Sequence, residues 1–187
     1  MTVSVDGFIA GPNDEVDRLF RWYFGGDTEI PIPGSPTLKV SRESAEVLLD
    51  AGRAGGAMVT GRHNFDVAGA WGGDPPTSPC FVVTHSVPKE WAGEGSPFVF
   101  VTEGIETAIR LAKEAAGDKD VEVGTASTLQ QCLNAGLLDE IHIDVAPILL
   151  GTGIRLFDKL AIGPTDLEII RVVSAPCVTH LRYRIVR

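Results

Sequence analysis

The chain contains little cysteine, and its cysteines do not occur in pairs. The three of them, Cys80, Cys132 and Cys177, are far apart and form no C-x-x-C motif. This pattern favours neither a disulfide framework nor a zinc site, and it is typical of a protein of the reducing cytoplasm.

Long hydrophobic runs are also missing. No apolar run approaches the roughly 18 residues that a membrane-spanning helix requires. The first residues, MTVSVDGFIAG, carry Asp6 where a signal peptide has an uninterrupted apolar stretch. We therefore expect a cytoplasmic protein with no membrane partner.

Positive charge is scarce, since the formal net charge is -9 at pH 7. Proteins bind phosphate-rich partners through clustered Lys and Arg side chains, so we expect no nucleic-acid partner. The four histidines lack metal-ligand spacing, no H-E-x-x-H motif occurs, and no G-x-S-x-G motif marks a nucleophilic serine. The sequence thus predicts neither a metal site nor a hydrolytic nucleophile.

Glycine and proline are plentiful, with 21 and 12 residues among 187, and the hydrophobic fraction is 44%. This composition indicates a globular protein with many tight connections. The length suits one domain with a substantial core, so we assign residues 1–187 to a single domain.

Short apolar runs alternate with helical patterns through the middle of the chain. Predicted strands cover residues 3–10, 57–60, 80–84, 98–101, 121–124, 141–145, 167–173 and 178–186. Predicted helices start at Ser41, at Arg62, at Ile105 and at Ser127, the last through a capping box with Gln130. Residues 16–24 suit one or two helical turns, and residues 25–39, with three prolines, are predicted to be irregular.

This order predicts an α/β fold with a mostly parallel sheet, helices on both faces and a C-terminal antiparallel hairpin. Ligands of such sheets bind beyond the carboxyl ends of the strands. Three strand ends there carry donors suited to an anion: Gly61-Arg62-His63, Thr84-His85, and Gly124-Thr125-Ala126-Ser127-Thr128.

Each of these signals has a purely structural alternative. Arg62 would then be a surface arginine after a turn, and Ser127 would only cap its helix. Trp71 either packs against the core or lines a pocket for a planar ring. Asp6 either starts a turn or faces a substrate.

Taken in order, these segments resemble the dihydrofolate reductase-like superfamily, in the branch of RibD C-terminal domain-containing proteins. The similarity covers nearly the whole chain. It is carried by residues 4–12 (SVDGFIAGP), 60–62 (TGR), 81–85 (FVVTH), 133–157 (LNAGLLDEIHIDVAPILLGTGIRLF) and 178–183 (VTHLRY).

The resemblance implies a three-layer dihydrofolate reductase-like fold and an NADPH cofactor lying across the strand ends. By motif, Ile9 and Ala10 would line the nicotinamide, and Gly61, Arg62 and His63 would bind the phosphates. Thr84 and His85 would lie beside the adenosine with its 2′-phosphate, and residues 124–128 (Gly124, Thr125, Ala126, Ser127, Thr128) would hold the pyrophosphate. Asp6, Phe8, Trp71 and Leu150 would border the substrate.

The predicted activity is therefore hydride transfer from NADPH to a small heterocycle, pterin- or pyrimidine-like. The resemblance implies an oxidoreductase similar to dihydrofolate reductase or to the 5-amino-6-(5-phosphoribosylamino)uracil reductase of riboflavin biosynthesis, with folate not the favoured substrate. The alternative is a non-catalytic nucleotide-binding protein, because Thr125 stands where similar proteins commonly have a second glycine. The resemblance also implies a homodimer.

Overall fold

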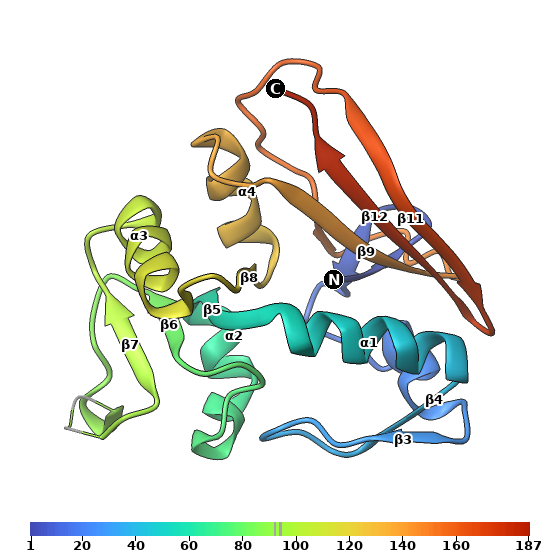
Figure 1. The fold of residues 1–187 in the computed structure, drawn as a ribbon, viewed down its shortest axis with the longest axis horizontal. Helices are drawn as coiled ribbons and strands as arrows, with labels where there is room; N and C mark the ends of the chain where they lie inside the picture. The colour runs from blue at the N-terminus through green and yellow to red at the C-terminus, as the bar shows by residue number, and fades with distance from the viewer. Residues whose placement is uncertain (92, 94) are drawn as a thin grey trace.

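The computed structural model describes residues 1–91, 93 and 95–187, and its strands form two separate main sheets (Figure 1). The first sheet is parallel throughout, with the order β7-β6-β5-β8. Its strands are β5 (Gly55–Gly61), β6 (Cys80–Val83), β7 (Phe98–Val101) and β8 (Asp120–Val123). β5 therefore lies between β6 and β8, and the carboxyl ends of these three strands share one edge.

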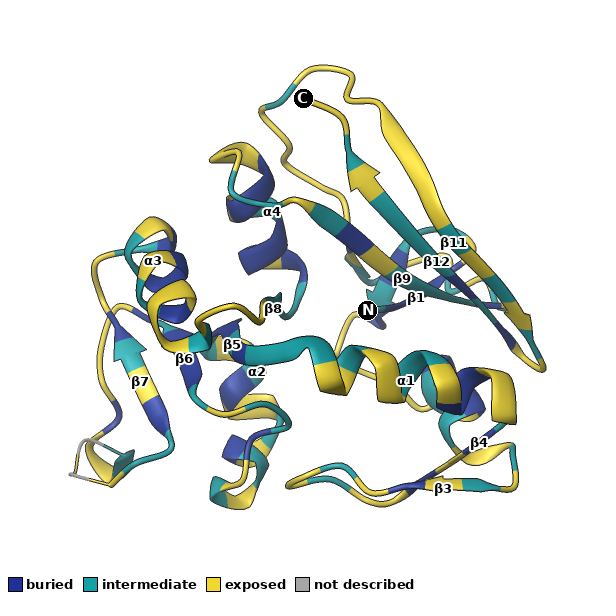
Figure 2. Cartoon of the chain, in the orientation of Figure 1, coloured by how far each residue is buried: buried dark blue, intermediate teal, exposed yellow. Residues whose placement is uncertain are grey.

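The second sheet is mixed, with the order β1-β9-β12-β11. Its strands are β1 (Thr2–Ser4), β9 (Glu140–Ala146), β11 (Leu167–Ala175) and β12 (Val178–Ile185). β1 runs parallel to β9, whereas β12 runs antiparallel to β9 and to β11. The predicted C-terminal hairpin is thus confirmed, and β11 is the outer strand of the sheet, with much of its length exposed (Figure 2).

Among the described residues, four α-helices cover the sheets on both sides (Figure 1). They are α1 (Arg42–Ala54), α2 (Arg62–Val67), α3 (Ile105–Ala116) and α4 (Ala126–Asn134). α3 buries Ile105, Ala108, Ile109 and Ala112, the apolar positions that recur at helical spacing. These residues pack on one face of the parallel sheet, together with Phe81.

The opposite face of that sheet packs against α2. Cys80 and Val82 alternate with Phe81 along β6, so they point to the other side, where they contact a cluster with Phe65 of α2 and Phe98. Helices therefore cover both faces, and the predicted α/β class is confirmed. Burial on both faces explains why β6 reads as a continuous apolar run.

The short elements correct three details of the sequence prediction. The strand predicted over residues 3–10 is broken by a turn at Asp6 and Gly7 into β1 and β2 (Phe8–Ala10), and β2 pairs with β10 (Ile154–Arg155). The segment predicted as irregular contains a hairpin of β3 (Thr28–Ile30) and β4 (Leu38–Val40). The predicted cap at Ser127 is wrong, because α4 starts at Ala126 with Thr125 in the N-cap position.

The part of the chain that the structure describes also contains 3-10 helices: η1 (Leu19–Phe24), η2 (Gly69–Gly73) and η3 (Lys89–Trp91). η1 confirms the helical turns expected before Gly25. Its Trp22 is buried and packs with the β3–β4 hairpin residues Ile30, Leu38 and Val40. The prolines of this segment, Pro31, Pro33 and Pro36, lie in the loop between β3 and β4, outside the paired residues.

Candidate functional site

The carboxyl ends of β5, β6 and β8 bring the three predicted anion-binding segments to one edge of the parallel sheet. The register pairs Gly61 with Val83 of β6, so Thr84 follows directly beside Arg62. On the other side Val59 pairs with Val123, and the N–H of Gly124 donates to the carbonyl of Val59 at 2.9 Å. Residues far apart in the sequence are therefore neighbours here.

Gly61 faces the start of α4. A Cβ added to Gly61 would lie 3.7 Å from Thr128 Cγ2 and 4.0 Å from Thr125 Oγ1. The two threonine hydroxyls are 3.2 Å apart, and the Thr128 hydroxyl also donates to the carbonyl of Gly124. The end of β5 and the amino end of α4 thus form the two sides of one small cradle.

The amino end of α4 has the character of an anion site. Thr125 makes no side-chain capping bond, and the first N–H groups of a helix have no partner inside it. Ala126 and Thr128 are buried, whereas Ser127 is exposed and interacts with Gln131. Together with the positive end of the helix dipole, these N–H groups favour a bound phosphate or pyrophosphate.

Thr125 adopts a backbone conformation that is unusual for its type. Its φ of 75° and ψ of 160° lie in a region populated almost only by glycine. A β-branched side chain is therefore held under strain at the entrance of the cradle. The sequence resemblance implies a second glycine at this position, and this backbone conformation is one that glycine adopts without strain.

Arg62 connects the start of α2 with the loop after β6. Its Nε donates to Asp66 Oδ1 at 2.7 Å, and its Nη1 donates to the carbonyl of Ser86 at 3.1 Å. The hydroxyl of buried Thr84 donates to that same carbonyl at 2.8 Å. Arg62 and Thr84 therefore hold one loop between them, and the exposed His85 lies within it.

The loop after β2 reaches the same region through His63. His63 Nε2 lies 2.9 Å from Asp14 Oδ1, and His63 itself is exposed. Ile9 and Ala10 immediately precede this loop on β2. Ala10 is buried, and its carbonyl contacts the backbone at Gly153, where a Cβ would overlap it.

Asp6 does not present a free carboxylate. Ser4 donates to its Oδ1 at 2.6 Å, while the N–H groups of Leu150 and Gly151 donate to it at 3.1 and 2.7 Å. The hydroxyl of Ser4, followed by these two N–H groups, lowers the pKa of Asp6 to about 2. The carboxylate therefore fixes the Leu150 loop against the turn between β1 and β2.

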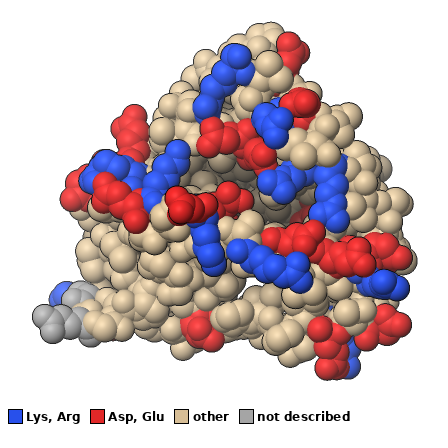
Figure 3. All heavy atoms as spheres, viewed as in Figure 1, with Lys and Arg blue, Asp and Glu red and all other residues tan. Residues whose placement is uncertain are grey.

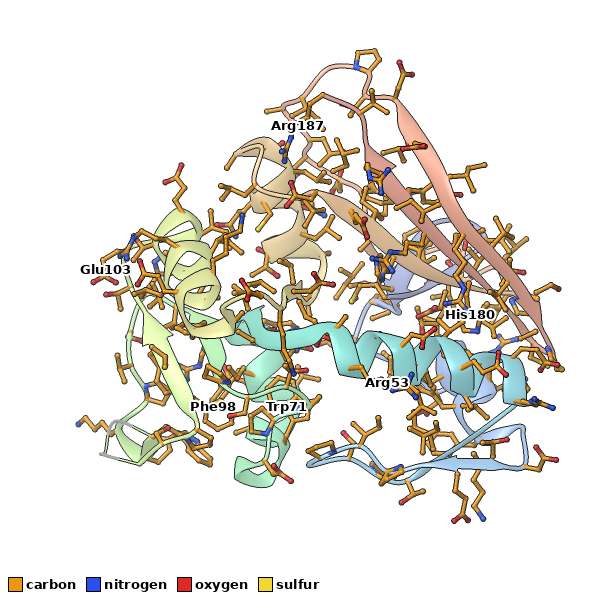
Figure 4. All side chains as sticks on the ribbon, in the orientation of Figure 1. Arg53, Trp71, Phe98, Glu103, His180 and Arg187 are labelled. Carbon is orange, nitrogen blue, oxygen red and sulfur yellow. The ribbon has the colours of Figure 1, made fainter. Side chains whose placement is uncertain are left out.

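Phe8 and Trp71 lie in different surroundings. Phe8 is buried on β2, and the guanidinium of Arg155 sits 4.5 Å from the centre of its ring. Trp71 belongs to the aromatic cluster on the α2 side of the parallel sheet, with its ring centre 6.4 Å from that of Phe98 (Figure 4). Its backbone is left-handed, with φ of 47°.

Several residues of this region carry no readable signal in the sequence. Asp14, Asp66 and Ser86 each bind a predicted site residue, yet nothing in their local sequence marks them. Gly153, in contrast, does carry a signal in the sequence. It belongs to the Gly151-Thr152-Gly153 turn, whose two glycines both have positive φ.

A second cluster of polar side chains is buried beside the first turn of α1. His180 Nδ1 is 2.7 Å from Asp144 Oδ1, and His180 Nε2 is 2.9 Å from Ser44 Oγ (Figure 4). Burial opposes ionisation of Asp144, but the amino terminus and His180 hold the pKa of its carboxyl below the usual range. Ser44 is only 1% exposed, so this trio stabilises the interior.

Within the described ranges, no three His, Cys, Asp or Glu side chains gather as a metal site would require. Nor does any helix among the described residues have the length and apolar character needed to cross a membrane.

The α/β architecture and the clustered strand ends define a protein of dihydrofolate reductase-like fold. The chain belongs to the RibD C-terminal domain family, which it matches over residues 1–181. The resemblance found in the sequence is thereby confirmed. The uncharacterized protein YyaP of Bacillus subtilis (strain 168) is 25% identical over 167 residues, covering 84% of this chain and 77% of that protein.

Solved structures share the fold. A putative riboflavin biosynthesis protein from Shewanella sp. PV-4 gives a TM-score of 0.74 at 24% identity, covering 99% of this chain and 96% of that one. A diaminohydroxyphosphoribosylaminopyrimidine deaminase/5-amino-6-(5-phosphoribosylamino)uracil reductase from Thermotoga maritima gives 0.63 at 12% identity. The match covers 98% of this chain but 54% of the Thermotoga chain.

Proposed function

We propose that this protein is an NADPH-dependent reductase of a small heterocyclic compound, pterin- or pyrimidine-like. The observation that carries the proposal is the convergence of Gly61-Arg62, Thr84 and Gly124-Thr125 at one sheet edge. The fold of the family and the uracil reductase activity named for the Thermotoga protein support a reductase.

The residues at this edge fit a dinucleotide. The open N–H groups at residues 126–128 suit the pyrophosphate, and Gly61 leaves room beside them. Arg62 and His63 supply donors for phosphate oxygens, while Thr84 and His85 border the adenosine side. Ile9 and Ala10 would lie at the nicotinamide end. When bound, the reduced nicotinamide would supply the hydride.

The substrate would lie beside Phe8, Leu150 and Trp71. Asp6 would act there as a positioning residue, because its carboxylate already accepts the N–H groups of the Leu150 loop. The remaining task of this chain is to orient the two rings and to exclude water. We also propose that the protein works in the cytoplasm as a homodimer, with a small molecule as its other partner.

The first experiment titrates the protein with NADPH and with NADH, following nicotinamide fluorescence. Arg62→Ala should weaken NADPH binding about tenfold or more, as expected for the loss of a charge-assisted phosphate contact. NADH binding should weaken less, because NADH lacks the extra phosphate charge of NADPH, for which the guanidinium should matter most. Arg110→Ala is the matched control, because Arg110 also pairs with an acid four residues on, Glu114, but lies on α3. Equal loss for both cofactors would contradict this placement of Arg62.

A second candidate function is a nucleotide-binding protein without turnover. The observation that favours it is Thr125, whose strained side chain borders the cradle where the pyrophosphate would lie. Loss of NADPH absorbance with a panel of pterins and pyrimidines separates the two functions. Turnover of any member excludes the non-catalytic protein, whereas absence of binding at millimolar NADPH would count against both.

A further inference from the structure

Both basic side chains predicted to bind the cofactor phosphates lie against a carboxylate. Arg62 Nε donates to the two carboxylate oxygens of Asp66, at 2.7 and 2.9 Å, from one turn earlier on α2. His63 Nε2 lies 2.9 Å from Asp14 Oδ1. Opposite charges at such short distances offset each other. A phosphate at this edge therefore meets a guanidinium whose charge is already paired.

A third carboxylate stands at the end of the neighbouring strand. Val83 of β6 pairs with Val101 of β7. His85 and Glu103 each follow this pair by two residues, so they lie beyond adjacent strand ends, and adjacent strands are about 5 Å apart in a sheet. The Glu103 carboxylate accepts the N–H of Thr102 at 2.9 Å and its hydroxyl at 3.3 Å. These bonds hold the negative charge beside the end of β7, where α3 begins (Figure 4).

These carboxylates bear on the one chemical difference between NADPH and NADH. NADPH carries a 2′-phosphate on its adenosine half, and a phosphate monoester has a charge of about −1.5 to −2 at pH 7. In dinucleotide sites an arginine accommodates this phosphate, whereas an acidic residue hydrogen-bonds the free 2′-hydroxyl of NADH. Here the guanidinium of Arg62 is accompanied by the carboxylates of Asp14, Asp66 and Glu103. These residues are therefore not arranged to select the phosphorylated cofactor alone.

The charge of the whole chain acts in the same direction. The formal net charge is -9 at pH 7, and acidic and basic side chains are interspersed over the face shown in Figure 3. Exposed charges act over about 10 Å at 0.1 M salt and over longer distances at lower salt. The surrounding field thus favours the cofactor with fewer negative charges.

We propose that Asp66 and Glu103 are specificity-determining residues, through which the site accepts NADH about as well as NADPH. This inference rests on the proposed function, which places the adenosine half of the cofactor beside Thr84 and His85. Arg62 favours the 2′-phosphate, whereas the carboxylates of Asp66 and Glu103 repel it and offset that contribution. The three charged residues together set the balance between the two cofactors.

The test measures the dissociation constants of NADPH and NADH by nicotinamide fluorescence at low ionic strength. The two constants should differ by less than about tenfold in the natural chain. Asp66→Asn and Glu103→Gln each remove one negative charge but keep an acceptor oxygen for Arg62 and for Thr102. Each variant should bind NADPH about threefold more tightly, and the double variant about tenfold, with NADH binding changed less than about twofold.

Asp118→Asn is the matched control. Asp118 is exposed in the turn between α3 and β8, at the opposite edge of the parallel sheet, and its substitution removes the same charge. The ratio of the two dissociation constants should equal that of the natural chain. Calorimetry with adenosine 2′,5′-bisphosphate and with AMP tests the adenosine half alone. The double variant should bind the bisphosphate about tenfold more tightly, with AMP binding unchanged.

A natural chain that binds NADPH more than about tenfold tighter than NADH would overturn the inference. An unchanged ratio in the double variant would also overturn it, while the proposed function would stand because both cofactors still bind. Absence of binding of both cofactors to the natural chain would overturn the proposed function, and the inference with it.

Discussion

Asp6 and Gly151 are 145 positions apart in the sequence, yet the carboxylate of one accepts the N–H of the other at 2.7 Å. This bond joins the turn between β1 and β2 to the loop that follows β9. Leu150 makes a parallel bond to the same carboxylate. The predicted substrate residues Asp6 and Leu150 are thus in direct contact, and the ionised carboxylate holds them together.

The first prediction concerns the acid dependence of this contact. The pKa of Asp6 is lowered from 3.8 to about 2, so its ionised form stabilises the fold above about pH 4. This contribution is lost as the pH falls from about 4 to 2. Asp6→Asn should therefore be clearly less stable than the natural chain at pH 7 and closer to it at pH 2, measured by urea unfolding. The exposed Asp17→Asn should show no such convergence, and a pH-independent difference for Asp6→Asn would contradict the assignment.

Thr125→Gly should stabilise the protein. Relief of the strained backbone at Thr125 should raise the free energy of unfolding by about 1–3 kcal/mol. The greater conformational freedom of glycine in the unfolded chain lowers it again by about 0.5–1 kcal/mol. A net gain of about 1 kcal/mol raises the melting temperature by roughly 2–4 °C. Thr107→Gly, within α3, should instead lower it, and a fall for both variants would argue against strain at Thr125.

Two glycine-to-alanine changes should have opposite effects on stability. Gly153 has φ of 141°, and an added Cβ would overlap the Ala10 carbonyl, so Gly153→Ala should destabilise by more than about 2 kcal/mol. Gly52 lies within α1 with nothing within 4 Å of an added Cβ. Gly52→Ala should therefore stabilise by about 0.5–1 kcal/mol. Calorimetry of both variants measures the two stability changes. Destabilisation of the same size in both variants would contradict the predicted opposite effects.

Ser44→Ala should weaken the buried cluster of Ser44, His180 and Asp144 beside the first turn of α1. The change leaves His180 Nε2 without the hydroxyl that lies 2.9 Å away, and an unsatisfied buried group costs about 1–3 kcal/mol. The exposed Ser174→Ala should change the unfolding free energy by less than about 0.5 kcal/mol. Urea unfolding distinguishes the two, and similar values would show that the buried bond contributes little.

Thiol labelling should count one reactive cysteine in the native protein. Burial raises the pKa of Cys80 to about 12 and that of Cys132 to about 11, whereas Cys177 is exposed in the β11–β12 turn. A thiol reagent at pH 8 should therefore modify Cys177 alone, and all three cysteines after unfolding. Cys177→Ser should abolish the native reaction, and rapid labelling of that variant would contradict the burial of the other two.

Much of the fold was predictable because local pattern and burial agree. The start of α3 at Ile105 and both bounds of β7 match the predictions, since a helical apolar stripe and a compact apolar run are each clear local patterns. The β3–β4 hairpin was missed because Pro31, Pro33 and Pro36 dominate the local signal, whereas packing under Trp22 decides the structure.

The site was predictable only to the level of strand ends. Parallel strands bring their carboxyl ends to one edge, so Gly61, Thr84 and Gly124 could be grouped from the sequence. The contacts of Arg62 with Ser86 and of His63 with Asp14 depend on loop conformations that no local pattern specifies. The roles of these residues in cofactor binding stay predictions.

The pairing of Thr2 with Asp144 has a consequence for synthesis of the protein. β1 is translated long before β9, so it has no ladder partner until β9 has also been translated. At the usual elongation rate of about 5–20 residues per second, that wait is roughly 7–30 s. During this time the amino-terminal segment, with Val3, Phe8 and Ile9, is an uncovered apolar stretch, which makes it a natural target for chaperones that act on nascent chains.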